Sequence, residues 1–483
     1  MHARRRRGLA AALALATAVS GGVLVALPAP EASAATEVTI TPNPAYRLSE
    51  FQGWGTSLVW FANATGDYPP ELRQELFDRL FGEEGLDLNV ARYNIGGGNA
   101  SDVPDYLRPG AAVEGWWAEQ LDPEAGATST YADRVDFLAE WDADDPASYD
   151  FDADRTQRWW VDAIAAEQGD EMVWEAFANS PPYFMTNSGF ATGSFTSTDE
   201  SVIADPAVAE AYATYLATVV AEMESAHGID VQTLAPFNEP CNGYWGTNLP
   251  EGAEWPPFNG RTQEGAQICA GPGPGQQQAI LAEVEQALVD AGLDTHISSN
   301  DETNPGRFVQ AWNAYDAAAR DDVDQINVHT YGTGQREVAR DIARAEGLPL
   351  WMSEVGGNWV SGDGFDPLTI EGGLGIAQHI TNDLRILQPD AYVLWQEVED
   401  LYNMERVEQL NWGSVFIDFD CAEPGTEGYS VRRLADAGWA EGEPLPEEAR
   451  CQVVTNSKFD TLRNFTHYIQ PGSTIIATDD AQT

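Results

Sequence analysis

The sequence is poor in basic residues, histidine and cysteine, and these shortages exclude several functions. It carries 25 Lys+Arg against 77 Asp+Glu, a formal net charge of −52. Such a surface repels phosphate backbones and anionic lipids, so we expect no nucleic-acid or membrane partner. The 6 histidines are scattered without H-E-x-x-H spacing, and the 4 cysteines match no zinc motif, so we predict no metal and no cofactor.

Two further motifs are missing. No G-x-S-x-G elbow is present, which excludes the usual serine-esterase arrangement. The run GPGPG from Gly271 lacks the Lys-Ser/Thr of a phosphate-binding loop, so we interpret it as a turn.

A long apolar run occurs at the start of the chain only. Residues 1–34 join four arginines to an Ala/Leu/Val run and the small residues Ala32-Ser33-Ala34, a pattern typical of a secretory signal peptide. The pair Arg6-Arg7 is also compatible with twin-arginine export. No later segment reaches the roughly 18 apolar residues of a membrane span. We therefore predict a secreted, extracellular and soluble protein, and a monomer.

The few cysteines suit an exported chain. An even number in an oxidising compartment predicts two disulfides, for which three connectivities are possible. Pairing of neighbours along the chain, Cys241 with Cys269 and Cys421 with Cys451, is the prediction made here. Each bridge would close a loop of roughly 30 residues and contribute about 3 kcal/mol.

Short apolar segments alternate with helical patterns along most of the chain. Strands are predicted in eight segments: 51–60, 86–96, 171–182, 231–240, 295–302, 324–332, 348–356 and 391–399. Helical spacing of apolar residues lies between them, at 70–81, 209–226, 276–292, 336–347 and 373–388. Eight strand–helix repeats favour a closed (β/α)₈ TIM barrel, which we place at residues 51–470.

Two strands lie outside this repeat. One is predicted within residues 36–50 and another within 471–483, after a helix in KFDTLRNFTHYIQ. Together they would form a small side β-layer, which we expect to be incomplete. The Asp-, Pro- and Trp-rich stretch Ser101 to Asp154 is too long for an ordinary loop, so we interpret it as a functional insertion.

The predicted strand ends carry carboxylates. The fourth strand leads to Asn238-Glu239, the seventh to Ser353-Glu354 and the eighth to Trp395-Gln396-Glu397. In a (β/α)₈ barrel these ends surround one opening, so glutamates on the fourth and seventh strands face each other. Two opposed carboxyl groups are the arrangement that glycoside hydrolysis requires.

The ordered set FQGWGTSLVW, ARYNIGGG, FANSPPYFMT, APFNEP, HTYG, LWMSEVGG and VLWQ resembles glycoside hydrolase family 30. The resemblance runs from about Thr36 to the last residue and is greatest to the endo-β-1,6-galactanase branch. It implies a secreted retaining endo-glycosidase that cleaves β-1,6-linked galactan side chains of arabinogalactan. The expected partner is a polysaccharide or oligosaccharide substrate.

The resemblance also assigns roles at the strand ends. Glu239 matches the general acid/base and Glu354 the nucleophile, with carboxyl groups expected about 5 to 5.5 Å apart. Asn238 matches a residue that binds the sugar 2-hydroxyl. Arg92 and Tyr331 match residues that steady the nucleophile, the former by charge and the latter by its hydroxyl.

Further positions match residues that line the cleft. Trp395 is expected to form a floor for an apolar sugar face, and the other matches are Trp54, Asn94, Asn179 and Tyr183. The pair Trp116-Trp117 would either extend the cleft or fix the insertion to the barrel. His329 is interpreted as a barrel histidine with satisfied hydrogen bonds, not as a base or metal ligand.

Other functions remain open at this stage. The same family contains β-1,6-glucanase, xylanase and glucosylceramidase-like activities, although no arginine that would hold glucuronate is identifiable here. A non-catalytic carbohydrate-binding barrel is the alternative from another class. The presence of both Glu239 and Glu354 argues against it, because a binding protein needs no opposed carboxylates.

Overall fold

A computed structural model describes residues 39–98, 109–118, 137–192, 202–241, 246, 264–265, 268–360 and 364–478. The described chain clusters into a large compact unit, Arg47–Ile475, and a small one formed by its two ends. Within the described residues, no helix combines the length and the apolarity that crossing a bilayer requires.

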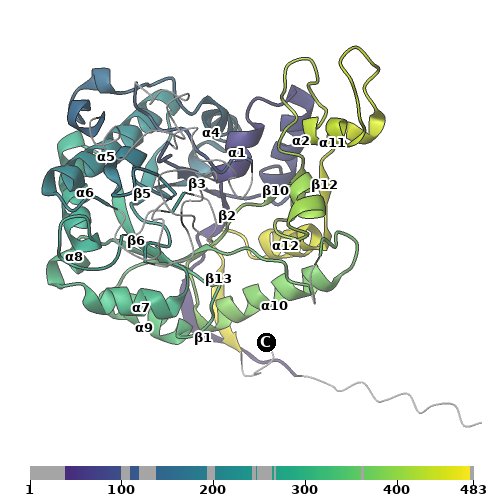
Figure 1. Cartoon of the computed structure of the whole chain (residues 1–483). Coiled ribbons are helices and arrows are strands. Elements are labelled where there is room, and N and C mark those ends of the chain that lie inside the picture. The colour runs from purple at the N-terminus through teal and green to yellow at the C-terminus, as the bar shows by residue number, and fades with distance from the viewer. Residues whose placement is uncertain are drawn as a thin grey trace, which may run out of the picture. The chain divides into compact units, whose positions relative to one another are not determined.

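The large unit contains a closed barrel of parallel strands (Figure 1). Its strands are β2 (Gly53–Ser57), β3 (Val90–Asn94), β4 (Val173–Phe177), β5 (Val231–Ala235), β6 (His296–Glu302), β7 (Gln325–His329), β8 (Leu350–Glu354) and β9 (Ala391–Leu394). The barrel closes between β2 and β9, where Gly53 lies opposite Ala391. Each strand falls inside one of the eight predicted segments, and the predicted (β/α)₈ fold is confirmed.

Helices alternate with these strands. They are α1 (Val59–Thr65), α2 (Pro70–Leu80), α4 (Arg155–Gln168), α5 (Pro206–His227), α6 (Gln277–Ala291), α7 (Pro305–Ala314), α8 (Ala317–Asp321), α9 (Arg336–Glu346), α10 (Glu371–Ile386), α11 (Val431–Asp436) and α12 (Ser457–Tyr468). Short 3₁₀ turns lie at Pro146–Ser148, Gly169–Glu171, Tyr183–Met185 and Glu447–Ala449, and a π turn at Asn403–Val407. Helix α12, near the end of the chain, lies beside α10 (Figure 1).

Local chemistry sets the ends of the long helix α5. Asp205 accepts a hydrogen bond from the backbone N–H of Ala207, and Pro206 occupies the first helical position, where its missing N–H is not needed. Gly228 ends the helix with a φ of 65°, a left-handed conformation that glycine adopts without a Cβ clash. The turn predicted at Gly271 lies just before the start of α6.

Two small sheets accompany the barrel. The predicted terminal strands form β1 (Pro42–Glu50) and β13 (Thr474–Thr478), which pair with each other. A second sheet was not predicted: β10 (Val398–Asp400) runs parallel to β11 (Val415–Ile417), and β12 (Val454–Thr455) runs antiparallel to β11. Strands of two or three residues leave no periodic signal, because their pairing depends on contacts far apart in the sequence.

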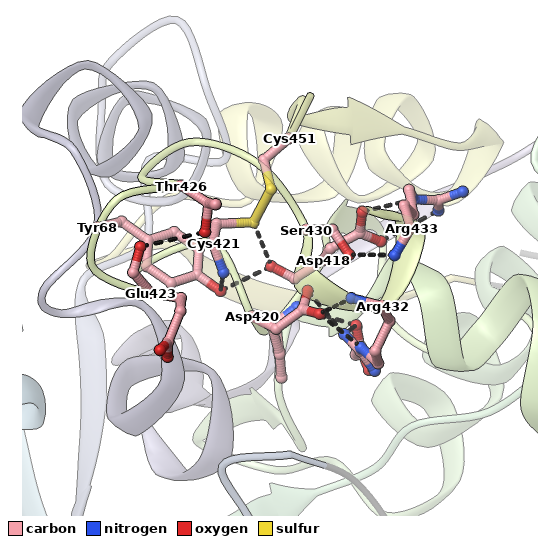
Figure 2. The surroundings of a disulfide bond; sticks show 12 residues. Tyr68, Asp418, Asp420, Cys421, Glu423, Thr426, Ser430, Arg432, Arg433 and Cys451 are labelled. Carbon is pink, nitrogen blue, oxygen red and sulfur yellow. Dashed lines mark hydrogen bonds and ion pairs between the residues drawn. A yellow bond between two sulfur atoms is a disulfide. The ribbon is translucent and has the colours of Figure 1, made fainter. Parts of the chain in front are cut away.

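Both predicted disulfides are present, Cys241–Cys269 and Cys421–Cys451. Ion pairs and hydrogen bonds surround the second bridge (Figure 2). The Tyr68 hydroxyl donates to the carbonyl oxygen of Asp418 at 2.6 Å, and Arg433 pairs with the Asp418 carboxylate at 2.6 Å. The bridge therefore lies within a polar network that also includes Tyr68, in the loop between α1 and α2, far from the bridge in the sequence.

Candidate active site

The fourth and seventh barrel strands deliver two glutamates to one place. Glu354 is the last residue of β8, and Glu239 lies in the loop that follows β5. Glu239 has a left-handed backbone with a φ of 42°, and its N–H donates to the carbonyl oxygen of Asp301 at 2.8 Å. Both side chains are almost fully buried, so their charges interact through little water.

His329 lies between the two glutamates. Its Nδ1 is 3.4 Å from Oε1 of Glu239 and 3.5 Å from Oε1 of Glu354. Its Nε2 is 3.2 Å from Oδ1 of Asp301. The histidine is buried and surrounded by partners, as expected, but these partners include the two carboxylates that the sequence singled out.

Charge explains the protonation of His329. Burial alone would lower its pKa, but the Glu354 charge and the Asp301 hydrogen bond outweigh burial and raise the pKa to about 10. The pKa of Asp301 is raised by burial, yet Arg92 and His329 more than compensate and hold it at about 2. An imidazolium therefore faces both glutamates at neutral pH.

Arg92 forms hydrogen bonds and ion pairs with residues next to the two glutamates. Its guanidinium donates to Glu175 at 2.6 Å and to Asp301 at 2.7 Å, and also to the carbonyl oxygen of Ser353 at 3.1 Å. The side chains of Arg92, Glu175 and Asp301 are fully buried. Arg92 thus contacts the backbone beside Glu354 and the partner of His329, and its charge also lowers the pKa of Glu354.

Tyr331 and Trp412 form a wall beside Glu354. The Tyr331 hydroxyl donates to Oε1 of Glu354 at 2.9 Å. The ring of Trp412 stacks on Tyr331 with centroids 6.0 Å apart and planes at 25°. Trp412 was not among the predicted cleft residues, because it lies in the loop between β10 and β11, outside the eight strand ends.

The pKa of Glu354 reflects opposing influences. Burial raises it, the His329 charge lowers it, and the Glu239 charge raises it again, with smaller decreases from Arg92 and from the Tyr331 hydrogen bond. The result is a pKa raised to about 7. Burial and the neighbouring Glu239 charge therefore outweigh the three influences that favour the ionised form of Glu354.

The remaining polar candidates lie at the ends of β3, β4 and β5. Asn94 ends β3, and its Oδ1 accepts a hydrogen bond from the backbone N–H of Asn179 at 3.3 Å. Within the described residues, neither side-chain amide atom of Asn179 has a hydrogen-bond partner, and Oδ1 of Asn238 also lacks one. Buried amides without partners are costly in a protein interior, and a bound ligand with hydroxyl groups would satisfy them.

The aromatic candidates have different surroundings. Trp395 follows β9, is 5% exposed, and contacts Trp60 edge to face at 5.1 Å. Trp54 is the second residue of β2, far from the strand ends, and its indole N–H donates to the carbonyl oxygen of Ile469 at 2.7 Å. Because Trp54 packs at the opposite end of its strand from the glutamates, the structure gives it a packing role and not a cleft position.

The insertion uses its tryptophans for packing. Trp116 and Trp117 are 0% and 1% exposed. Trp117 contacts Tyr183 edge to face at 5.5 Å and Phe184 at 5.0 Å, so it fixes the insertion to the loop after β4. Tyr183 is itself buried in this aromatic cluster. Residues 99–108 and 119–136 of the predicted insertion lie outside the described residues.

One group of side chains has the composition of a metal site. A carboxylate oxygen of Glu239, one of Glu354 and a ring nitrogen of His329 lie within 4.8 Å of one another. Zinc accepts such ligands, but it requires a neutral imidazole. The raised pKa of His329 means that a metal would have to displace a proton there.

A parallel barrel with two buried, opposed glutamates at its strand ends defines the glycoside hydrolase class of site. The model of O-glycosyl hydrolase family 30 matches residues 122–407, and the chain belongs to this family.

Two curated relatives act on β-1,6-galactose linkages according to their names. The exo-beta-1,6-galactobiohydrolase of Bifidobacterium longum is 36% identical over 98% of this chain, and the chain spans 35% of that relative's length. The endo-beta-1,6-galactanase of Hypocrea rufa is 26% identical over 80% of this chain and 71% of the relative.

Solved structures share the fold at low identity. A conserved exported protein from Bacteroides fragilis superposes with a TM-score of 0.63 at 18% identity, covering 92% of this chain and 84% of the other. The catalytic domain of GH30 xylanase C from Talaromyces cellulolyticus gives 0.59 at 16% identity, covering 92% and 82%. These similarities support the fold alone.

Proposed function

We propose that this chain hydrolyses β-1,6-linked galactan, the side chain of arabinogalactan, with retention of configuration. The observation that carries the proposal is the buried pair Glu239 and Glu354, with His329 between them and one atom of each within 4.8 Å of the others. Retaining enzymes need carboxyl groups about 5 to 5.5 Å apart, without room for a water molecule between them and the sugar.

The contacts of the two glutamates support different roles. Glu354 accepts a hydrogen bond from the Tyr331 hydroxyl, which stabilises its ionised form and suits a nucleophile. Glu239 then acts as the acid that protonates the leaving oxygen, and as the base that activates water in the second step.

Asn238 and Asn179 are proposed to bind the sugar hydroxyl groups. Their buried side chains carry amide atoms without partners in the described part of the chain. Asn238 directly precedes Glu239, and Asn179 follows β4, the strand next to β5 in the barrel. Trp395, held by Trp60, is proposed as the apolar floor. Hydrogen bonds to hydroxyl groups that strengthen in the transition state would raise the rate as well as the affinity.

The position of cleavage has two candidates. The resemblance favours an endo-acting enzyme, as the name of the Hypocrea rufa relative also indicates. The Bifidobacterium longum relative, more similar and matched over nearly the whole chain, is named as an exo-acting galactobiohydrolase. Release of a disaccharide from chain ends is therefore the second candidate. The predicted signal peptide and the two disulfides support an extracellular location for either activity.

The test is a time course of products from de-arabinosylated arabinogalactan, with linear β-1,6-glucan and glucuronoxylan as competing substrates. A ladder of β-1,6-galacto-oligosaccharides from the first substrate supports endo cleavage, and galactobiose alone from the earliest time supports the exo candidate. Cleavage of another polymer in preference would overturn the substrate. An α-anomer as the first product, detected by NMR, would overturn retention.

The assignment of Glu354 is tested by Glu354→Gln, which keeps the shape and removes the nucleophilic charge. We expect kcat to fall by at least about 10³-fold while oligosaccharide binding persists, because a nucleophile acts on the chemical step. Glu346→Gln, an exposed glutamate at the end of α9, is the control and should retain full activity. Unchanged turnover in Glu354→Gln contradicts the assignment.

A further inference from the structure

Lys458 is the only lysine in the 483-residue sequence, in which every other basic side chain apart from histidine is an arginine. It is also buried, with 3% of its surface exposed. A lysine in a protein this acidic would be expected on the surface, where its charge is solvated. Its burial therefore calls for a specific compensating interaction.

The position of Lys458 in its helix adds to the energetic cost of burying its charge. It is the second residue of α12, where Asn456 accepts a hydrogen bond from its backbone N–H at 2.9 Å. The amino end of a helix carries partial positive charge, so a cation in the first turn is unfavourable. Burial lowers the pKa of Lys458 to about 7 despite the opposing charges of Glu397 and Glu399.

The ammonium group joins two loops. It donates to the carbonyl oxygen of Gly357 at 3.0 Å and to that of Asn411. Gly357 lies three residues after Glu354 at the end of β8, and Asn411 directly precedes Trp412. One side chain thus ties the loop of the proposed nucleophile to the loop that carries the aromatic wall.

Neighbouring contacts hold the same loops. The Asn456 side chain donates to Oδ1 of Asn411 at 3.1 Å and to the carbonyl oxygen of Gly413 at 3.2 Å, so Trp412 is held on both sides. The indole of Trp412 lies so near Gly356 that a Cβ there would be 3.2 Å from the ring. Trp412 in turn stacks on Tyr331, which donates to Glu354.

We propose that Lys458 is a positioning residue: through its bonds to Gly357 and Asn411 it holds Trp412 against Tyr331 and fixes the hydrogen bond from Tyr331 to Glu354. The effect of Lys458 on catalysis rests on the proposed function, in which Glu354 is the nucleophile. The hydrogen bond from Tyr331 would stabilise Glu354 in its ionised form. A lysine suits the task since a slender ammonium with three donors reaches two carbonyl groups where a planar guanidinium would not fit.

The kinetic test is the pH profile of kcat/KM for Lys458→Met, a substitution that keeps the length and removes the donors. Because the Tyr331 hydrogen bond lowers the pKa of Glu354, a weakened bond should move the acidic limb of the profile to higher pH. A shift of one unit would lower kcat/KM about tenfold on the acidic side, with little change at the optimum. A profile that coincides with that of the wild type overturns the proposal.

Two further variants separate positioning from general stability. Phe459→Leu, at the next position of α12, removes packing from a buried ring and should lower the melting temperature without moving the profile. Tyr331→Phe should produce the same shift as Lys458→Met, and adding Lys458→Met to it should produce no further shift, because both act through one bond. Additive shifts overturn the proposed path.

One measurement does not depend on activity. A crystal structure of Lys458→Met should show Trp412 displaced from Tyr331. An unmoved Trp412 overturns the proposal. Failure of the wild type to hydrolyse any of the three polymers would instead refute the proposed function and leave this structural test in place.

Discussion

At the scale of single residues, the candidate site depends on one imidazolium shared by three carboxylates. The sequence was sufficient to predict Glu239 and Glu354, because strand ends and motifs mark both positions. It was insufficient for the role of His329, whose partners come from β5, β6 and β8 and meet only in the closed barrel. The pairing of Arg92 with Glu175 and Asp301 was unpredictable for the same reason.

This arrangement predicts a pH dependence of stability. The pKa of His329 is raised to about 10 in the folded protein, against about 6.5 in an unfolded chain. The contribution of His329 to the free energy of unfolding is therefore fully present below pH 6.5 and is lost as the pH rises through 10. We expect the melting temperature of the wild type to fall over this range, and that of His329→Gln to fall less.

The control for this prediction is His296→Gln, which replaces a largely exposed histidine at the start of β6. Parallel melting curves for the wild type and His329→Gln across the range would show that His329 is not charged between the carboxylates.

At the scale of elements, the eight strands and their helices were predictable because each leaves a local apolar pattern of its own length. The sheet of β10, β11 and β12 was not, since these strands have 3, 3 and 2 residues and lie far apart in the sequence. That sheet and the Cys421–Cys451 bridge follow the last barrel strand, and the loop between β10 and β11 brings Trp412 to the site.

Removal of the Cys421–Cys451 bridge tests how much it stabilises the folded protein. The double variant Cys421→Ser/Cys451→Ser opens a loop with a sequence separation of 30 residues. We expect a loss of about 3 kcal/mol in the free energy of unfolding, measured by urea denaturation. Cys241→Ser/Cys269→Ser, with a separation of 28, is the matched control for loop length.

The two double variants should differ in stability. The polar network of Figure 2 connects the second bridge to Tyr68, so its loss should disturb more than chain entropy. Equal unfolding free energies for the wild type and Cys421→Ser/Cys451→Ser would contradict a stabilising role for this bridge.

At the scale of the whole molecule, charge is the dominant property. The sequence carries a net charge of −52, while its buried ion pairs, such as Arg92 with Asp301, are shielded from solvent. Repulsion among exposed carboxylates opposes the compact state and is screened by salt, whereas buried pairs are screened much less. Composition alone was sufficient for this inference, because it needs no knowledge of the fold.

We therefore expect the melting temperature to rise between about 10 mM and 150 mM NaCl, as the Debye length falls from about 30 Å to 8 Å. Differential scanning calorimetry measures the change, with sucrose at equal osmolality as the control for solvent effects. A melting temperature that falls on addition of salt would indicate that attractive surface pairs outweigh the repulsion.

The left-handed backbone at Glu239 has a consequence for the capture of ligands. A side chain with a Cβ pays about 1 kcal/mol or more in that conformation, and asparagine tolerates it better than glutamate does. Glu239→Asn should therefore melt at a higher temperature than Glu239→Gln while both lack the acid, and a lower value would contradict this reasoning. Glu239→Asn, which relaxes the main chain, is then the variant best suited to trapping an intact oligosaccharide in a crystal. The same substitution would be favoured in a homologue that evolves from hydrolysis towards sugar binding.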